Sequence, residues 1–386
     1  MTLAAGTGPL YLRTRKRGLM SGRPLVPLLV CIASFSLAAC DESKLQVQKP
    51  VDSAKPLASA SAPVAEAPLP PMPVAAPLAA TPQPLPEMKL PDGYTLTAEK
   101  VALGKQLFFD KRLSKDGSAA CTSCHLPEKG WTDGKVVSTK VDGKANTRHS
   151  PSLFNVGYND LWYWDGRSAT MEKQTEAAWK GQMGADPAVV TAALQKIPGY
   201  TVQFRTVFGH DATPADVVGA LTAFVRTLRS GDAPWDRFEK GDKKAVGEDA
   251  VRGFGLFRNK AGCAGCHAPP LYTDNAFHDV GIGFDKPEPD LGRGKITKND
   301  KENGAFKTPT LRSVTTHAPY FHDGRSATVE EAVDYMLGGG IKDKNPNLDA
   351  KLKPVKLSAK ERTDLLAFVK ALEAPTSAFE APKLPE

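Results

Sequence analysis

The sequence lacks two features that would assign it to other broad classes of protein. The apolar run at residues 25–37 is too short for a membrane-spanning helix, which needs about 20 residues. The basic surplus is confined to the N-terminus, because the first 40 residues hold five Lys or Arg and no acid. Beyond them, 45 basic and 43 acidic side chains remain. A nucleic-acid-binding surface needs a concentrated basic face, so we expect no nucleic-acid partner.

Cysteine is also scarce, and four of the six cysteines lie in two C-x-x-C-H units: Cys121/Cys124/His125 and Cys263/Cys266/His267. A C-x-x-C pair in an exported protein forms a disulfide or a redox pair in some cases. A histidine directly after the pair indicates c-type haem attachment instead. The two thiols bond the haem vinyl groups, and the histidine supplies an axial nitrogen to the iron. One such unit could arise by chance, but two predict two covalently bound haem c groups.

The N-terminus has the pattern of an export signal. Residues 1–40 combine a basic segment, an apolar run and small residues directly before Cys40. This favours a lipoprotein signal in which Cys40 becomes lipidated, and an ordinary cleaved signal is the alternative. Residues 41–90 contain eleven prolines with many alanines, which predicts an extended tether. We therefore expect a periplasmic protein that touches the membrane only through the lipid on Cys40.

The remaining residues show helical patterns and few strand signals. Apolar residues recur at helical spacing in residues 97–108, 213–228, 329–337 and 358–372. The predicted fold is mostly α, with two c-type cytochrome domains and long haem-wrapping loops. The domains are expected at residues 91–235, with the N-terminal haem, and at residues 236–386, with the C-terminal haem.

An internal repeat links the two predicted domains. Residues 163–172 (YWDGRSATME) match residues 321–330 (FHDGRSATVE), and residues 150–153 (SPSL) match residues 308–311 (TPTL). The offset from the proline to Trp164 or His322 is 13 in both halves. A third match follows the haem motifs, where Trp131-Thr132-Asp133 pairs with Tyr272-Thr273-Asp274. Three matches in the same order indicate two versions of one module.

The repeat makes differences between the halves informative. Met336 lies 14 residues after His322, and the equivalent position, 14 residues after Trp164, is Ala178. Methionine is a thioether ligand that raises the reduction potential of a haem, whereas alanine cannot bind iron. We predict a closed His267/Met336 electron-transfer haem and a first haem with an open sixth position. The alternative for Met336 is a core methionine.

Trp164 stands at the repeat position that His322 occupies in the second half. An aromatic ring between two haems relays electrons in principle. The plainer interpretation is a buried core tryptophan, and the two roles are compatible.

At this point the sequence resembles the bacterial di-haem cytochrome c peroxidase family, which includes the MauG-type enzymes. The resemblance runs from about Leu103 to Leu372. It is carried by the two C-x-x-C-H units and by LGKQLFFD at 103–110, YWDGR at 163–167, IPGY at 197–200, DNAFH at 274–278, FKTPTLR at 306–312 and APYFHDG at 318–324.

The resemblance implies a division of labour. The N-terminal haem is the peroxidatic one, the C-terminal haem takes electrons from a small donor protein, and a tryptophan matching Trp164 lies between them. The distal ligand of the second haem is methionine in the peroxidases and tyrosine in MauG, so Met336 sides with the peroxidases. Peroxidases that need reductive activation carry a blocking histidine after the first haem motif. Residues 126–147 contain none, so we expect the first haem to be open without activation.

Gln182 departs from the family pattern. The resemblance implies a glutamate over the open haem, but the corresponding stretch here reads Gln182-Met183-Gly184. Cleavage of the peroxide O–O bond needs a group that accepts a proton and returns it, which a carboxylate does and an amide does not. Either peroxidase activity is weak, or Glu176 or a water chain substitutes, or the alignment is displaced.

A second departure concerns calcium. The resemblance implies one ion between the haem domains, held by an asparagine side chain and two backbone carbonyls. The asparagine position here is His149, a carbonyl position is His317, and Pro319 is retained. Calcium prefers oxygen ligands, and imidazole suits transition metals. Calcium stays possible, and the simplest interpretation is that both histidines are polar residues near an interface.

The leading hypothesis is a peroxidase that reduces hydrogen peroxide to water with electrons from a small cytochrome or cupredoxin. Trp164 and Gln182 are its candidate catalytic residues. One alternative is MauG-like oxidation of a partner protein, and another is a non-enzymatic di-haem electron carrier or sensor. Lys307, Arg312 and Arg148 are candidate partners of haem propionates. The oligomeric state stays open, and a dimer is one possibility.

Overall fold

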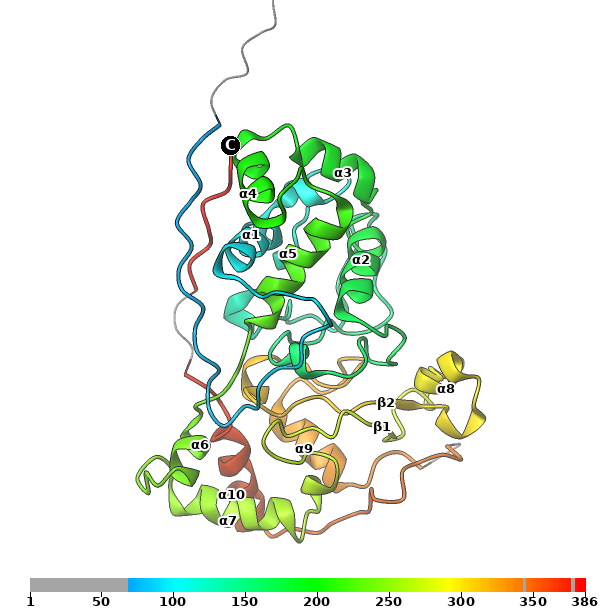
Figure 1. Ribbon diagram of the computed structural model, residues 1–386. Coiled ribbons are helices and arrows are strands. Elements are labelled where there is room, and N and C mark those ends of the chain that lie inside the picture. Colours follow the sequence, from blue (N-terminus) through cyan, green and yellow to red (C-terminus); the bar gives the residue numbers. More distant parts are fainter. Residues whose placement is uncertain (1–68, 343–344, 376–378) are drawn as a thin grey trace, which may run out of the picture. The chain divides into compact units, whose positions relative to one another are not determined.

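The computed structural model describes residues 69–342, 345–375 and 379–386 (Figure 1). The predicted signal, Cys40 and the first part of the predicted tether lie outside these residues. Helices dominate and strands are few, so the prediction of a mostly α fold is confirmed. None of the helices in the described part of the chain is long and apolar enough to cross a membrane.

Five helices form the first half of the fold. The predicted helix at 97–108 is confirmed as α1, which begins after Thr97, whose hydroxyl accepts a hydrogen bond from the Lys100 backbone N–H. The helix predicted after Thr213 is confirmed as α5 and starts with a capping box between Thr213 and Asp216. The five helices are α1 (Ala98–Phe109), α2 (Met171–Gly181), α3 (Pro187–Leu194), α4 (Pro198–Phe208) and α5 (Pro214–Arg226).

The second half holds five more helices and a small sheet. Capping boxes at Thr328 and Ser358 open α9 and α10, as the sequence predicts. The helices are α6 (Pro234–Glu239), α7 (Glu248–Arg258), α8 (Gly292–Thr297), α9 (Val329–Leu337) and α10 (Ala359–Lys370). Strands β1 (Phe277–Asp279) and β2 (Ala305–Lys307) pair antiparallel, with Phe277 opposite Lys307.

Short 3₁₀ turns connect these elements, and two of them carry the haem motifs. They are η1 (Lys111–Leu113), η2 (Cys121–Ser123), η3 (Pro127–Lys129), η4 (Val156–Tyr158), η5 (Cys263–Gly265), η6 (Asp300–Glu302) and η7 (Val314–Thr316).

Each half is built on a close crossing of two helices. In the first half α1 crosses α5, and a Cβ added at Gly104 would lie 1.8 Å from the Ala220 carbonyl oxygen. In the second half α7 crosses α10, and a Cβ added at Gly253 would lie 1.9 Å from the Asp364 carbonyl oxygen. Both glycines therefore allow a backbone approach that no larger residue permits. Figure 1 shows the two helix pairs in separate groups.

The loops of the two halves share left-handed residues at several matching positions. Left-handed residues recur at matching positions: Trp131 and Tyr272 (φ 66° and 54°), Asn155 and Ser313 (59° and 52°), Tyr163 and Phe321 (67° and 69°). The ion pairs Asp165–Arg167 and Asp323–Arg325 also match in position. Non-glycine residues rarely adopt positive φ, so this agreement reflects one shared loop design.

The halves meet through two reciprocal backbone hydrogen bonds. The His149 N–H donates to the His322 carbonyl, and the Lys307 N–H donates to the Trp164 carbonyl, both at 2.8 Å. In the repeat alignment His149 corresponds to Lys307 and Trp164 corresponds to His322. The two bonds are therefore equivalent, with the roles of the halves exchanged.

Both ends of the described chain pack onto the fold beyond the predicted boundaries. Within the predicted tether, the Ala79 carbonyl and the Thr81 hydroxyl accept hydrogen bonds from Arg229, both at 2.7 Å, and Leu85 is buried. At the other end, the Phe379 ring stacks on Phe109 of the first half, although the second domain was predicted to include it. Residues 79–85 of the predicted tether therefore contact the first half, and the C-terminus returns to the same half.

Candidate functional site

The first C-x-x-C-H unit is gathered in one turn. Cys121 opens η2, and the His125 backbone N–H donates to the Cys121 carbonyl at 3.1 Å. The His125 ring places Nδ1 2.8 Å from the Trp131 carbonyl oxygen. Because a carbonyl only accepts, Nδ1 carries the proton and Nε2 holds the free lone pair. Burial lowers the pKa of His125, which favours the neutral, metal-binding form.

The second unit has the same geometry. The His267 N–H donates to the Cys263 carbonyl at 2.9 Å, and Nδ1 lies 3.0 Å from the Tyr272 carbonyl oxygen. Burial lowers the pKa of His267 as well. Tyr272 corresponds to Trp131 in the repeat, so both imidazoles are oriented by the carbonyl of a matched aromatic residue in the left-handed conformation.

The four thiols are free, and none forms a disulfide. Burial raises the pKa of Cys121 to about 12 and that of Cys263 to about 11. Two partly exposed thiols and a fixed imidazole within one turn fit the attachment of a haem c group at each unit. The predicted attachment residues are thus brought together twice, once in each half.

Met336 and Ala178 stand at the same place on matched helices. The N-cap of α2 is Thr170 and that of α9 is Thr328, and each hydroxyl accepts a hydrogen bond from the backbone N–H three residues later. Ala178 and Met336 each lie eight residues after that threonine. The side chain of Met336 is half-buried. The structure therefore agrees with the sequence alignment that pairs a thioether in one half with a methyl group in the other.

Gln182 caps the C-terminus of α2. Its backbone N–H donates to the Ala178 carbonyl at 2.8 Å, and its backbone carbonyl accepts from Val141 at 2.9 Å. Its side-chain Oε1 is buried and has no hydrogen-bond partner among the described residues. The four-residue step from Ala178 to Gln182 places both residues on one side of the helix.

Glu176 does not share that side. Its carboxylate pairs with Lys180 at 2.5 Å, and both side chains are about half exposed. The other acid of α2, Glu172, pairs with Arg226 at 2.7 Å. Neither carboxylate of this fully described helix is available to replace the amide of Gln182.

Trp164 lies at the boundary between the halves. Its indole N–H donates to the His149 carbonyl at 2.9 Å, and its own carbonyl accepts from Lys307 at 2.8 Å. The side chain is half-buried. Its repeat partner, His322, is buried and stacks on Phe306, with ring centroids 3.5 Å apart. The two matched positions thus carry an indole in one half and an imidazole in the other.

The three basic candidates for haem propionates differ in their partners. Arg312 forms a fully buried ion pair with Asp236 at 2.8 Å. Arg148 pairs with Asp165 at 2.7 Å and with Asp290 at 2.8 Å. No ion pair engages Lys307 in the described part of the chain, and burial lowers its pKa to about 8. Lys307 is therefore the cation that remains for a carboxylate outside the protein chain.

One further cluster has the composition of a metal site. Cys266, Asp274 and His278 offer ligand atoms within 4.8 Å of one another. The His278 ring already pairs with Asp274 at 2.9 Å and with Asp349 at 2.5 Å. Cys266, Asp349 and Asp274 raise the pKa of His278 to about 10, although burial opposes the shift. Since Cys266 belongs to the second haem unit, we assign no metal to this cluster.

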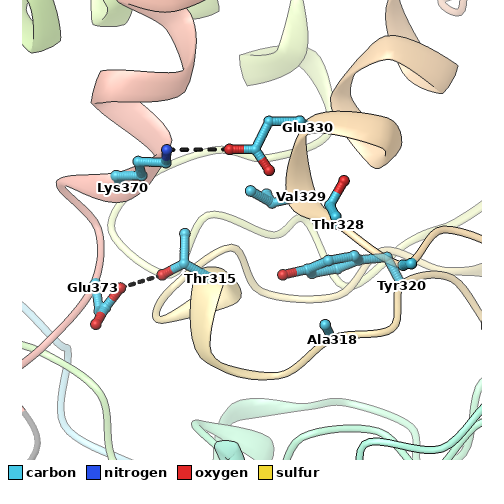
Figure 2. Close-up of a pocket in the computed structure, with 9 residues that line it drawn as sticks. Thr315, Ala318, Tyr320, Thr328, Val329, Glu330, Lys370 and Glu373 are labelled. Carbon is cyan, nitrogen blue, oxygen red and sulfur yellow. Dashed lines mark hydrogen bonds and ion pairs between the residues drawn. The ribbon is translucent and has the colours of Figure 1, made fainter.

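A separate open pocket of about 430 Å³ lies in the second half, between the start of α9 and the end of α10 (Figure 2). Lys370 pairs with Glu330 at 3.1 Å on one wall, and Thr315 donates to Glu373 on another. None of the predicted haem-attachment residues lines it. The pocket is therefore distinct from the candidate haem sites.

His149 and His317 stand at two positions that the calcium expectation names, an asparagine side chain and a backbone carbonyl. The His149 Nδ1 lies 2.7 Å from the Lys135 carbonyl, and its Nε2 is buried without a partner among the described residues. The His317 Nε2 is in the same situation. Nitrogen ligands of this kind are unsuited to calcium. No sequence signal marks Asp290, which pairs with Arg148 at this boundary from a loop 142 positions away.

Comparisons with known proteins agree with this geometry. The family model described as di-haem cytochrome c peroxidase matches residues 98–244. The methylamine utilization protein MauG of Methylorubrum extorquens is 41% identical over 76% of this chain and 84% of that protein. The cytochrome-c peroxidase IdrP1 of Denitromonas iodatirespirans is 37% identical over 78% of this chain and 89% of that protein.

A solved structure of a MauG-like protein is also similar to this chain. The crystal structure of a MauG-like protein associated with microbial copper homeostasis is 30% identical, with a TM-score of 0.70, and the match covers 76% of this chain and 94% of that one. The identity and coverage of these relatives extend the family match through both halves. The chain belongs to the di-haem cytochrome c peroxidase family, which includes MauG.

Proposed function

We propose that the protein reduces hydrogen peroxide to water with electrons from a small redox protein, such as a cytochrome or cupredoxin. The observation that carries this proposal is the asymmetry between two otherwise matched helices. At the same distance from the N-cap, α9 carries Met336 and α2 carries Ala178. A thioether closes one site, and a methyl group leaves the other open to a small molecule.

The two halves are proposed to be two c-type cytochrome modules. The matched turns at Cys121 and Cys263, the matched glycine crossings and the matched left-handed loop residues support a duplicated module. His125 and His267 would each hold one haem, with the four cysteines as covalent anchors. Lys307, without a carboxylate partner among the described residues, would pair with a propionate.

The bound haem groups supply one-electron redox chemistry and, at the open position, a place for peroxide. The protein must then carry electrons between the halves and deliver protons. Trp164 lies at the boundary and is suited to the first task. Its indole N–H donates to a backbone carbonyl, which is not a base at neutral pH, so the indole keeps its proton when an electron passes.

Reduction of one peroxide to two waters consumes two electrons and two protons. Gln182 has an unpartnered buried amide oxygen that is able to accept a hydrogen bond from a bound peroxide. An amide orients the peroxide but does not take up a proton and return it. Since Glu176 pairs with Lys180 on another side of α2, we expect slow turnover in the native protein.

Oxidation of a partner protein is the second candidate. The 41% identity to MauG favours it, as does the lack of any histidine between residues 126 and 147. Met336, in place of the tyrosine expected of a MauG-type enzyme, weighs against it. An electron carrier or sensor is the third candidate, and Gln182 favours that role.

The location is proposed from the sequence. The signal pattern of residues 1–40 and Cys40 support a lipid-anchored protein in the periplasm. A periplasmic donor would reach the second half, where Met336 is proposed to complete an electron-transfer site.

The test is steady-state oxidation of a reduced small cytochrome c by hydrogen peroxide, with the native protein and Gln182→Glu compared. We expect slow turnover in the native protein and a gain of about 10²–10⁴ in the variant, the usual range for general acid–base catalysis. Gln195→Glu is the control, because Gln195 lies outside α2 and bonds to the Ala212 carbonyl. Inactivity of both proteins, together with two low-spin haem spectra that peroxide does not alter, would replace the peroxidase proposal with the carrier.

A further inference from the structure

The second C-x-x-C-H turn has an exposed rim that carries no acidic residue. Gly265, Ala268 and Pro269 are exposed at this turn. Residues 250–273, which contain the turn, include no Asp or Glu, although they include basic residues. The rim therefore offers small and apolar groups, and no carboxylate, to a protein that approaches the second haem site.

A second acid-free segment lies against this turn. Residues 350–360 contain four lysines and no Asp or Glu. The Lys351 ammonium lies 3.4 Å from the Gly265 carbonyl oxygen, between the two cysteines of the motif. Farther along, the Val355 N–H donates at 2.8 Å to the carbonyl of the last residue of α9, the helix of the proposed distal ligand. The segment therefore runs from the haem-attachment turn to α9, and Figure 1 shows it on the outside of the second half.

Three lysines of this segment form what we call the lysine face. Lys351, Lys353 and Lys356 are exposed, and no ion pair engages them in the part of the chain that the structure describes. The fourth lysine, Lys360, is engaged in an ion pair on α10. The carboxylate directly before the segment, Asp349, is paired with a histidine. The positive charge of the lysine face is therefore available to a partner.

We propose that the lysine face and the exposed rim bind an acidic small redox protein, the electron donor of the second haem. This partner assignment rests on the proposed function, because it names the donor for the electron-entry site proposed above. Electron-transfer contacts bury little surface, and the charges around their centre set the rate at which the partners meet. Carboxylates on the donor complement the lysines, whereas a basic donor is repelled.

The test measures electron entry alone, with the full haem-loaded protein and no peroxide. Reduced basic cytochrome c is used in two forms, unmodified and with its surface lysines succinylated, so that one donor presents either charge. Stopped-flow mixing gives the second-order rate constant of electron transfer to the oxidised protein. We expect the succinylated form to react faster at low salt, and its rate constant to fall as salt screens the charges.

Charge reversal locates the docking surface. Replacement of all three lysines of the lysine face by Glu should lower the rate constant of the succinylated form about tenfold or more. The matched control is Lys295→Glu/Lys298→Glu/Lys301→Glu, which makes the same change in net charge at exposed lysines in and after α8. Figure 1 shows α8 apart from α7 and the turn that follows it, so the control should lower the rate constant far less.

Four results would overturn the proposal: neither form transfers electrons, the unmodified form reacts faster, salt leaves the rate constant unchanged, or both triple variants lose rate equally. The salt dependence needs no variant, so it decides the matter even if a variant fails to fold. Anionic phospholipid vesicles represent a competing occupant. If they bind the wild type but not the lysine-face variant, while electron entry is the same in both, the face meets a membrane and the proposal is wrong.

The peroxide assay separates this proposal from the proposed function. A protein that accepts electrons through the lysine face but does not reduce peroxide would contradict the peroxidase reaction and support the docking surface. A protein that reduces peroxide with equal rates from both forms of the donor would do the reverse.

Discussion

The half around His125 and the half around His267 share several local backbone features and differ in side chains at matched positions. Both place a haem motif on a 3₁₀ turn, fix the imidazole with the carbonyl of a left-handed aromatic residue, and close on a glycine helix crossing. The differences lie at a few positions, Ala178 against Met336 and Trp164 against His322 among them. If the halves are two versions of one module, as proposed above, the matched geometry is kept in both and single side chains divide the proposed electron-transfer and peroxide-binding roles.

The largest effect is expected from a substitution that makes the first half resemble the second, because it tests whether Ala178 and Met336 are equivalent. Ala178→Met places a thioether at the position that Met336 occupies on α9. If the helices are equivalent, the open site closes and peroxide reduction falls to near zero, with a low-spin spectrum at both haems. Ala177→Met is the control, because Ala177 is exposed on the same helix. Full activity of Ala178→Met would show that the two positions do not correspond.

A second difference is a buried ion pair that only the second half has. Arg312 pairs with Asp236 with no exposed surface, and the matching residue of the first half is Phe154 in an apolar cluster. Asp236→Ala leaves the buried Arg312 guanidinium without its carboxylate partner. The variant should lose about 3–5 kcal/mol of unfolding free energy, measured by urea denaturation.

The matched control for this pair imitates the first half. The double variant Asp236→Leu/Arg312→Phe removes both charges and should cost clearly less than Asp236→Ala. A larger loss in the double variant would mean that the Arg312 bond to the Pro270 carbonyl, at 2.6 Å, matters more than the ion pair.

The helix crossings should respond alike in the two halves. Gly104→Ala and Gly253→Ala each place a methyl group within 2 Å of a backbone carbonyl, and each should cost about 3 kcal/mol, the upper end of overpacking costs. Denaturation of each variant measures this. Gly255→Ala on α7 is the control, since nothing lies within 4 Å of its added Cβ. Tolerance of alanine at one crossing only would break the equivalence of the halves.

The smallest expected effect concerns the pH dependence that His322 contributes. Burial lowers its folded pKa to about 4, although Asp290 opposes the shift, and the unfolded value is ~6.5. The folded state therefore binds fewer protons, and stability is full above the unfolded pKa and falls as the pH drops toward 4. The loss is at most about 3 kcal/mol over this window. His322→Gln should flatten that part of the profile, and an unchanged slope would assign it to other groups.

Local chemistry made much of the site predictable from the sequence. A C-x-x-C-H unit forms within one turn, so its residues meet wherever the chain folds. The caps at Thr97, Thr213 and Ser358 mark helix starts because the bonds they accept lie three residues away. The repeat paired Met336 with Ala178 by counting alone.

Contacts across long sequence separations were decided only by the tertiary structure. Packing pairs Arg148 with Asp165 and Asp290, and it pairs Arg312 with Asp236. Among the described residues no ion pair engages Lys307, although Asp160 acts on its charge. These ion pairs depend on which surfaces pack together. The periodicity of residues within one helix or strand does not specify that.

The sequence by itself therefore determined the two C-x-x-C-H units and the helix starts, because each depends on neighbours along the chain, and it also displayed the matched repeat segments. The tertiary structure decided how the copies meet: the Trp164 carbonyl accepts from Lys307, the His322 carbonyl accepts from His149, and two imidazoles are left without partners among the described residues. Those contacts join residues more than 140 positions apart, and only the packing of the two halves against each other creates them.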